Sequence, residues 1–139
     1  MLSGNYFFMN IVRETFGKQE KLSSRKIIEN LFENGSVFYT SLFKVVWDKS
    51  PVLLPFPAQV TFSVSKRGFK LAVTRNLIKR RMREAYRKSK QILYEHLKLA
   101  NSQLVFMIIL RGNEVPDYQQ VEKSMKEMMN KLIILSGEK

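Results

Sequence analysis

Residues 66–90 constrain the fold more than any other part of the chain. They contain eleven Lys and Arg residues and a single Glu, a surplus of ten positive charges in a chain whose formal net charge is +12. So many like charges cannot be buried, because an unpaired ion in an apolar core is strongly destabilising. Any fold of this chain must therefore leave one side of the segment in water.

The same segment carries an apolar pattern of helical period, which predicts a long helix from about Arg75 to about Leu97. At roughly 100° per residue, two opposite faces emerge. The residues of the basic face lie within about 80° of one another around the helix axis. They are Asn76, Arg80, Arg83, Arg87 and Lys90. The apolar face consists of Ile78, Met82, Ala85, Ile92 and Leu93. We expect the apolar face to pack on the core and the basic face to be exposed.

Shorter patterns predict the remaining elements. A helix fits Ser24–Asn34, with Ser23 or Ser24 as its cap and Gly35 after its end. A last helix fits the stretch after Asp117, where Gln120 completes a capping pattern. Alternating or continuous apolar residues predict strands at 43–48, 58–65, 71–73 and 104–110.

The resulting order, α-β-β-β-α-β-α, predicts the α+β class. It favours a sandwich in which helices pack mainly on one face of a small mixed four-stranded sheet. The length suits one domain, which we assign to residues 16–139. Residues 1–15 form an N-terminal extension, and Met9 is an alternative start of the protein.

The charge indicates a polyanionic partner. The sequence pI is near 10.1, and in the basic segment only Glu84 offsets the repulsion between neighbouring cations. A solvated helix face would account for a balanced mixture of Glu and Lys, but that balance is missing here. Because the planar guanidinium of Arg matches phosphate, nucleic acid is the favoured partner. No apolar stretch reaches the roughly 20 residues of a membrane span, so no membrane is expected.

Enzymatic chemistry by the chain itself is not indicated. The sequence has no Cys and only one His, His96, and its carboxylates are sparse and scattered. These features provide neither a clustered acid–base pair nor a metal cage. The lack of Cys agrees with a cytoplasmic location.

Two stretches of the basic region carry a specific resemblance. Residues 63–67 read Ser-Val-Ser-Lys-Arg, and residues 72–84 contain Ala-Val-Thr-Arg-Asn-Leu-Ile-Lys-Arg followed by Arg83-Glu84. In order and spacing they resemble the signature of the bacterial ribonuclease P protein family, and the likeness extends from about Phe16 to Ile133. The chain departs from the family pattern at Leu77, usually Arg, and at 69–71, where a Gly-Asn pair is usual. It also departs at Ile28, often an aromatic residue.

The resemblance implies an RNA-binding subunit of an endoribonuclease that removes the 5′ leader of precursor tRNA. The chemistry would belong to a catalytic RNA and its magnesium, with no cofactor held by the protein alone and no DNA partner. It also implies a left-handed crossover through the long helix. The expected contacts to the catalytic RNA are Arg75, Asn76, Lys79, Arg80, Arg83, Arg87 and Lys90. The expected contacts to the leader are Phe32, Lys44, Val46, Ser63, Ser65, Lys66 and Arg67, in a cleft between the first helix and the open sheet face.

Several alternatives remain open. Phe32 could be an ordinary core residue, and Ser63 and Ser65 could form a plain solvated strand face. A structural RNA binder of the ribosomal-protein type would share the charge and a similar fold but would lack the leader cleft. A helix-turn-helix DNA binder fits less well, because the basic helix follows a strand rather than a short helical partner.

Overall fold

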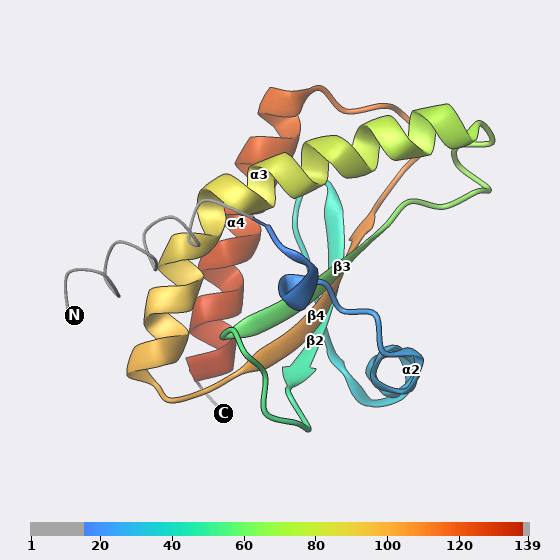
Figure 1. Ribbon diagram of the computed structural model, residues 1–139. Helices are drawn as coiled ribbons and strands as arrows, with labels where there is room; N and C mark the ends of the chain where they lie inside the picture. Colours follow the sequence, from blue (N-terminus) through green and yellow to red (C-terminus); the bar gives the residue numbers. More distant parts are fainter. Residues whose placement is uncertain (1–15, 138–139) are drawn as a thin grey trace.

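The computed structural model describes residues 16–137, and the expected N-terminal extension lies outside them. Residues 16–137 fold into one mixed sheet with three α-helices and a short 3-10 helix (Figure 1). In chain order the elements are η1 (Lys18–Glu20), α2 (Arg25–Asn34), β1 (Ser36–Tyr39), β2 (Phe43–Lys49), β3 (Ala58–Ser63), α3 (Ala72–Leu99), β4 (Leu104–Leu110) and α4 (Tyr118–Gly137). The predicted α+β class is confirmed.

Strand β4 holds the sheet together. The strand order is β1-β2-β4-β3, with β1 and β2 antiparallel, β2 and β4 antiparallel, and β3 and β4 parallel. A strand that has neighbours on both edges and is covered on both faces reads as a continuous apolar run, as residues 104–110 do. Helix α3 makes the connection that the parallel pair β3–β4 requires.

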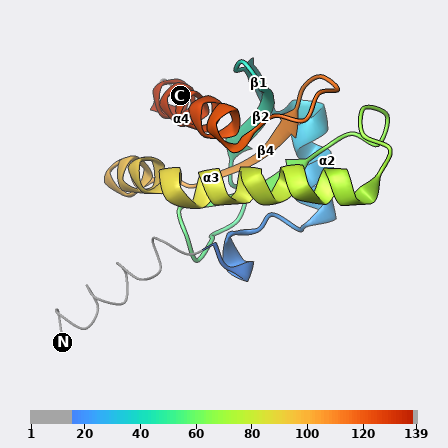
Figure 2. The ribbon, with the colours of Figure 1, turned by 90° about the horizontal axis from the view of Figure 1, so that it is seen from above.

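The main core lies between one face of the sheet and helices α3 and α4 (Figures 1 and 2). Alternate residues of β2 point to this side, and Phe43, Val45 and Trp47 are all buried there. Their partners on β4 include Phe106 and Ile108, which are fully buried as well. The predicted inward face of β2, including Trp47, is therefore confirmed.

Helix α2 covers part of the opposite face. Leu31 is fully buried in a second, smaller cluster with Val46 and Val105. The helix ends at Gly35, where a Cβ atom would lie 2.6 Å from both the Leu31 carbonyl oxygen and a methyl group of Val46. Glycine is therefore needed at position 35 because the backbone lies too close to Leu31 and Val46 to leave room for a side chain. Its backbone conformation does not require glycine, because any residue can adopt a φ of −68°.

The predicted helix caps are confirmed. The Ser24 hydroxyl accepts a hydrogen bond from the Ile27 N–H at 3.3 Å and begins α2. Before α4, the Asp117 carboxylate accepts from the Gln120 N–H at 2.8 Å, and the Gln120 side chain accepts from the Asp117 N–H at 2.9 Å. This reciprocal pair satisfies two donors that the first helical turn would otherwise leave unpaired.

Three local predictions are wrong, and one strand was not predicted. The stretch 71–73 is no strand: α3 begins at Ala72, and Leu71 and Val73 are 68% and 80% exposed, so they join no buried sheet face. The fourth strand of the sheet is instead β1, which the sequence patterns did not indicate. Strand β3 ends at Ser63, two residues earlier than predicted. On α3, Ile92 is exposed, and buried Tyr86 and Tyr94 complete the apolar face instead.

A buried ion pair attaches η1 to α3. Lys90 is fully buried, and its ammonium group pairs with the carboxylate of Glu20, which is also buried. The Tyr94 hydroxyl donates a second hydrogen bond to the same carboxylate at 2.6 Å. Burial lowers the pKa of Lys90, and Glu20 opposes that shift by stabilising the charged form.

Removing one partner of this pair should be costly. In Lys90→Met, the Glu20 carboxylate stays buried without its counter-ion, so we expect the free energy of unfolding to fall by about 3–5 kcal/mol. Urea denaturation measures it. The control is Lys88→Met, two residues earlier, whose side chain is 53% exposed; this variant should unfold almost like the parent protein. Equal midpoints for the two variants would show that the buried pair contributes no stability.

Candidate RNA interface

The outer face of α3 is a cationic surface. Asn76, Arg80 and Arg83 are exposed, as predicted, and Lys79 is half-buried. Within the described part of the chain, no hydrogen bond or ion pair engages the guanidinium groups of Arg80 and Arg83. Both are therefore available to phosphate groups, with which Arg forms paired hydrogen bonds.

Arg87 lies on the same face but is already paired. Its guanidinium binds the carboxylate of Glu84 one turn away, and Lys88 approaches that carboxylate at 3.9 Å. The hydrogen bond from Arg87 lowers the pKa of Glu84, so Glu84 is ionised at neutral pH. Glu84 thus relieves the repulsion within the cationic surface at its C-terminal end.

Lys90 does not belong to this surface. We expected it to continue the row of Asn76, Arg80, Arg83 and Arg87, but its side chain is fully buried against Glu20. The position of Lys90 on α3 lets its side chain reach Glu20 of η1. An ammonium group that is enclosed in this way cannot contact a phosphate group. The expectation that Lys90 contacts RNA is therefore wrong for this structure.

Two arginines of α3 bind backbone carbonyls. One nitrogen of the Arg75 guanidinium donates to the carbonyl oxygens of Phe69 at 2.7 Å and Lys70 at 3.0 Å. The corresponding nitrogen of Arg81 donates to the carbonyl oxygen of Pro116 at 2.6 Å. Part of the donor capacity of Arg75, which we expected at the RNA, is thus used inside the protein.

The second surface lies on the open face of the sheet. Register places Tyr39, Lys44, Ile109 and Ser63 in one row across all four strands. Tyr39 is half-exposed, and the other three side chains are only partly buried. This row combines an aromatic ring, a cation and a small hydroxyl group, which are features of surfaces that bind single-stranded RNA.

Phe32 and Val46, both predicted members of this surface, differ in their exposure to solvent. Phe32 is 65% exposed, so the alternative in which it is a core residue is wrong: its neighbour Leu31 occupies the core instead. Val46 is 3% exposed and lies under α2 beside Gly35. The expectation that Val46 contacts the leader is therefore wrong, because the helix covers it.

The loop after β3 extends the open face with charge. Ser65, Lys66 and Arg67 are all exposed, and the Ser65 hydroxyl accepts a hydrogen bond from the Arg67 N–H at 3.0 Å. Ser63, at the end of β3, precedes them on the open face. Four of the residues predicted from the resemblance are thus fully or partly accessible to solvent.

Two residues of the open face were missed by the sequence analysis. The guanidinium carbon of Arg111 lies 4.9 Å from the centre of the Tyr39 ring. Arg111 also donates to the Thr40 carbonyl oxygen at 2.9 Å, so its exposed side chain is held in place. These residues are far apart in the sequence, and only the pairing of β1 with β2 and β2 with β4 brings them together. In the sequence, the one signal for this pair was the position of Arg111, a basic residue directly after the apolar run 104–110.

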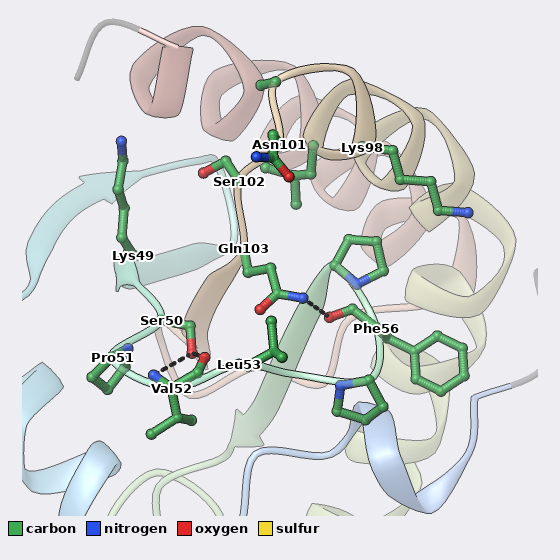
Figure 3. A pocket seen from close by; sticks show the side chains of 14 residues that line it. Lys49, Ser50, Pro51, Val52, Leu53, Phe56, Lys98, Asn101, Ser102 and Gln103 are labelled. Carbon is green, nitrogen blue, oxygen red and sulfur yellow. Dashed lines mark hydrogen bonds between the residues drawn. The ribbon is translucent and has the colours of Figure 1, made fainter.

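An open groove of about 780 Å³ lies at the other end of the sheet, between the loop 50–57 and the end of α3 (Figure 3). The Gln103 side chain crosses it, donating to the carbonyl oxygens of Leu54 at 2.8 Å and Phe56 at 3.4 Å. Its lining residues include Lys49 and Lys98 but no carboxylate or imidazole. The groove therefore offers no acid–base pair.

Other classes of site were also sought among residues 16–137. No three His, Cys, Asp or Glu side chains in this range gather closely enough to hold a metal ion. None of its helices has the length and hydropathy of a membrane span. The most distinctive features of the described chain are thus its two polar, cationic surfaces.

Known proteins share the sequence pattern and the fold of this chain. The family model "Ribonuclease P" matches residues 16–133. A ribonuclease P protein component from Porphyromonas gingivalis is 32% identical over 117 residues, which cover 83% of this chain and 85% of the relative. The fold resembles that of an RNase P protein from Thermotoga maritima, with a TM-score of 0.62 and 20% identity over 81% of this chain and 96% of that one. It also resembles an RNase P protein from Staphylococcus aureus, with a TM-score of 0.60 and 20% identity over 81% of this chain and 94% of that one. The chain therefore belongs to the ribonuclease P protein family.

Proposed function

We propose that the chain is the RNA-binding subunit that helps the catalytic RNA of ribonuclease P to remove the 5′ leader from precursor tRNA. The main support is the presence of two separate cationic surfaces, one on the outer side of α3 and one on the open sheet face. The loop of residues 65–70 joins them. A protein with this arrangement can bind two RNA segments at the same time.

The outer face of α3 is the proposed contact with the catalytic RNA. Exposed Arg80 and Arg83 provide phosphate contacts, and Asn76 adds an amide. Arg87, Lys79 and Arg75 contribute charge, although Arg87 shares its guanidinium with Glu84 and Arg75 shares its own with the loop. Folded RNA is rich in phosphate, and a rigid helix presents its cations at fixed spacing.

The open sheet face is the proposed contact with the leader. A single strand exposes its bases, which stack on aromatic rings while cations follow the backbone. Phe32 and Tyr39 supply the rings, and Lys44, Lys66, Arg67 and Arg111 supply the charge. Ser63 and Ser65 supply hydroxyl groups that can bind base edges or phosphates.

We propose further that magnesium is held by the RNA, where it stabilises the attack of water on a phosphodiester bond. In this scheme the protein supplies fixed cations, which reduce the repulsion between the catalytic RNA and its substrate. The proposed site of action is the cytoplasm.

A reconstitution experiment tests this function. Purified protein is added to the bare catalytic RNA at low magnesium, and cleavage of precursor tRNA is followed over time. We expect the protein to restore cleavage at magnesium concentrations at which the RNA alone is nearly inactive. A structural RNA binder of the ribosomal-protein type would bind RNA without this effect, so an unchanged rate would refute the proposed function.

The cationic face of α3 should govern holoenzyme assembly. In the double variant Arg80→Ala, Arg83→Ala, we expect binding to the catalytic RNA to weaken by about 1–3 kcal/mol. The dependence of log affinity on log salt should also become shallower by roughly 1–2, because fewer counterions are released. Filter binding at several salt concentrations measures both. The charge-matched control Lys49→Ala, Lys98→Ala, at the groove, should bind like the parent; equal losses in the two pairs would rule out a localised interface.

Phe32 should govern leader binding. For Phe32→Ala, we expect holoenzyme assembly to be unchanged, whereas affinity for precursor tRNA with a long leader falls by about 1–3 kcal/mol, the usual effect of losing a stacking platform. A substrate with a very short leader should bind as before. Because Phe32 is largely exposed, the unfolding midpoint should change little, as in the control Leu53→Ala at a 92% exposed site. Equal weakening for short and long leaders would exclude Phe32 from the leader site.

A further inference from the structure

Arg75 and Arg81 bind the two loops that lie beside the N-terminal half of α3. Arg75 donates to the carbonyl oxygens of Phe69 and Lys70, at the end of the loop after β3. Arg81 donates to the carbonyl oxygen of Pro116, at the end of the loop after β4. The end of each loop is therefore held against α3 by charge-assisted hydrogen bonding from an arginine, which is stronger than hydrogen bonding between neutral groups.

These loops carry side chains of the proposed leader surface. The first contains the exposed residues Ser65, Lys66 and Arg67, and the second begins with Arg111. In the first loop, the Phe69 N–H donates to the Ser65 carbonyl oxygen at 3.0 Å, and the Phe69 side chain is buried. The contact from Arg75 to the Phe69 carbonyl therefore acts on a residue that is anchored in the core and bonded to Ser65.

The two loops also support each other. A Cβ atom added at Gly68 would lie 3.2 Å from the carbonyl oxygen of Gly112. Such a contact is tighter than ordinary van der Waals packing, so the backbones of the two loops lie directly against each other. A displacement of one loop must therefore move the other, and both depend on the helix that holds them.

The chemistry of this contact favours arginine. The planar guanidinium of Arg75 reaches two successive carbonyl oxygens from one nitrogen while its other donors remain on the same rigid plane. A lysine ammonium keeps the charge but is a compact, strongly hydrated group on a flexible chain. Replacing Arg with Lys therefore separates the loss of geometry from the loss of charge.

We infer that Arg75 and Arg81 are positioning residues that hold the two leader-binding loops on the helix that contacts the catalytic RNA. This inference rests on the proposed function and deepens it. It gives two cations of the basic segment a role in substrate recognition, exerted through Ser65, Lys66, Arg67 and Arg111. The leader surface is thereby kept at a fixed position relative to the catalytic RNA.

The test compares charge-conserving variants in the reconstituted holoenzyme. The variants are Arg75→Lys and Arg81→Lys, and the matched control is Arg80→Lys on the exposed face of the same helix. For each, we measure affinity for the catalytic RNA, the salt dependence of that affinity, and the ratio of affinities for long-leader and short-leader precursor tRNA.

We expect Arg75→Lys and Arg81→Lys to lower the long-to-short ratio about tenfold, the effect of losing one charge-assisted hydrogen bond. Salt dependence should remain that of the parent protein, because the charge is conserved. Arg80→Lys should leave the ratio unchanged. If the ratio stays at the parental value in both loop variants, or if they behave like Arg80→Lys, the positioning role is wrong.

A second variant disturbs the same loops without touching an arginine. Gly68→Ala crowds the Gly112 carbonyl oxygen, so that the two loops must shift by a few tenths of an ångström at their contact while every charge stays in place. It should lower the long-to-short ratio and leave assembly intact, and unfolding midpoints recorded for all variants identify any that lose ligand binding by losing the fold. An unchanged ratio in Gly68→Ala would contradict the inference even if the arginine variants proved unstable.

The parent holoenzyme separates this inference from the proposed function. If it binds long and short leaders equally well, the open sheet face is not the leader site, and the proposed function fails together with the positioning role. If the parent holoenzyme binds the long-leader substrate more tightly than the short-leader one, and the loop variants show the same ratio of affinities, only the positioning role fails.

Discussion

The packing of α3 on the sheet is the contact on which the rest of the structure depends. Ile78, Met82 and Ala85 are fully buried on one side of this helix, whereas Arg80 and Arg83 are exposed on the other. Neighbouring like charges destabilise an isolated helix by a few tenths of a kcal/mol per pair, but burying a single large apolar side chain contributes roughly 1.5–3 kcal/mol. The core therefore holds together a helix whose charged face would otherwise favour unfolding.

Regular periodicity explains which elements could be predicted from the sequence. Helices α2 and α4 and strands β2 and β4 follow it closely, because each has a side that must be buried along its length. The stretch 71–73 imitates a strand, since two apolar residues at spacing two satisfy that pattern without being buried. Strand β1 has only four residues, of which Phe38 alone is buried, so it offers too short a pattern to detect.

The candidate site was predictable as far as helical geometry determines exposure. Arg80 and Arg83 follow directly from it, but Lys90 does not, because its partner Glu20 lies 70 residues away. Val46 has the alternation of a solvent-facing residue and is covered only because α2 crosses the sheet at Gly35. The pair of Arg111 and Tyr39 likewise depends on strand order. Each of these outcomes is a long-range contact, which no local pattern encodes.

The position of β4 has a consequence for synthesis of the protein on the ribosome. This strand lies between β2 and β3 in space but follows both in sequence, after the whole of α3. A nascent chain can form the β1–β2 hairpin early, but an isolated hairpin is at best marginally stable. Strand β3 has no sheet to join, and α3 no complete surface to cover, until residues 104–110 emerge. Folding is thus a late, concerted event, and until then the basic helix is synthesised without the core that holds it.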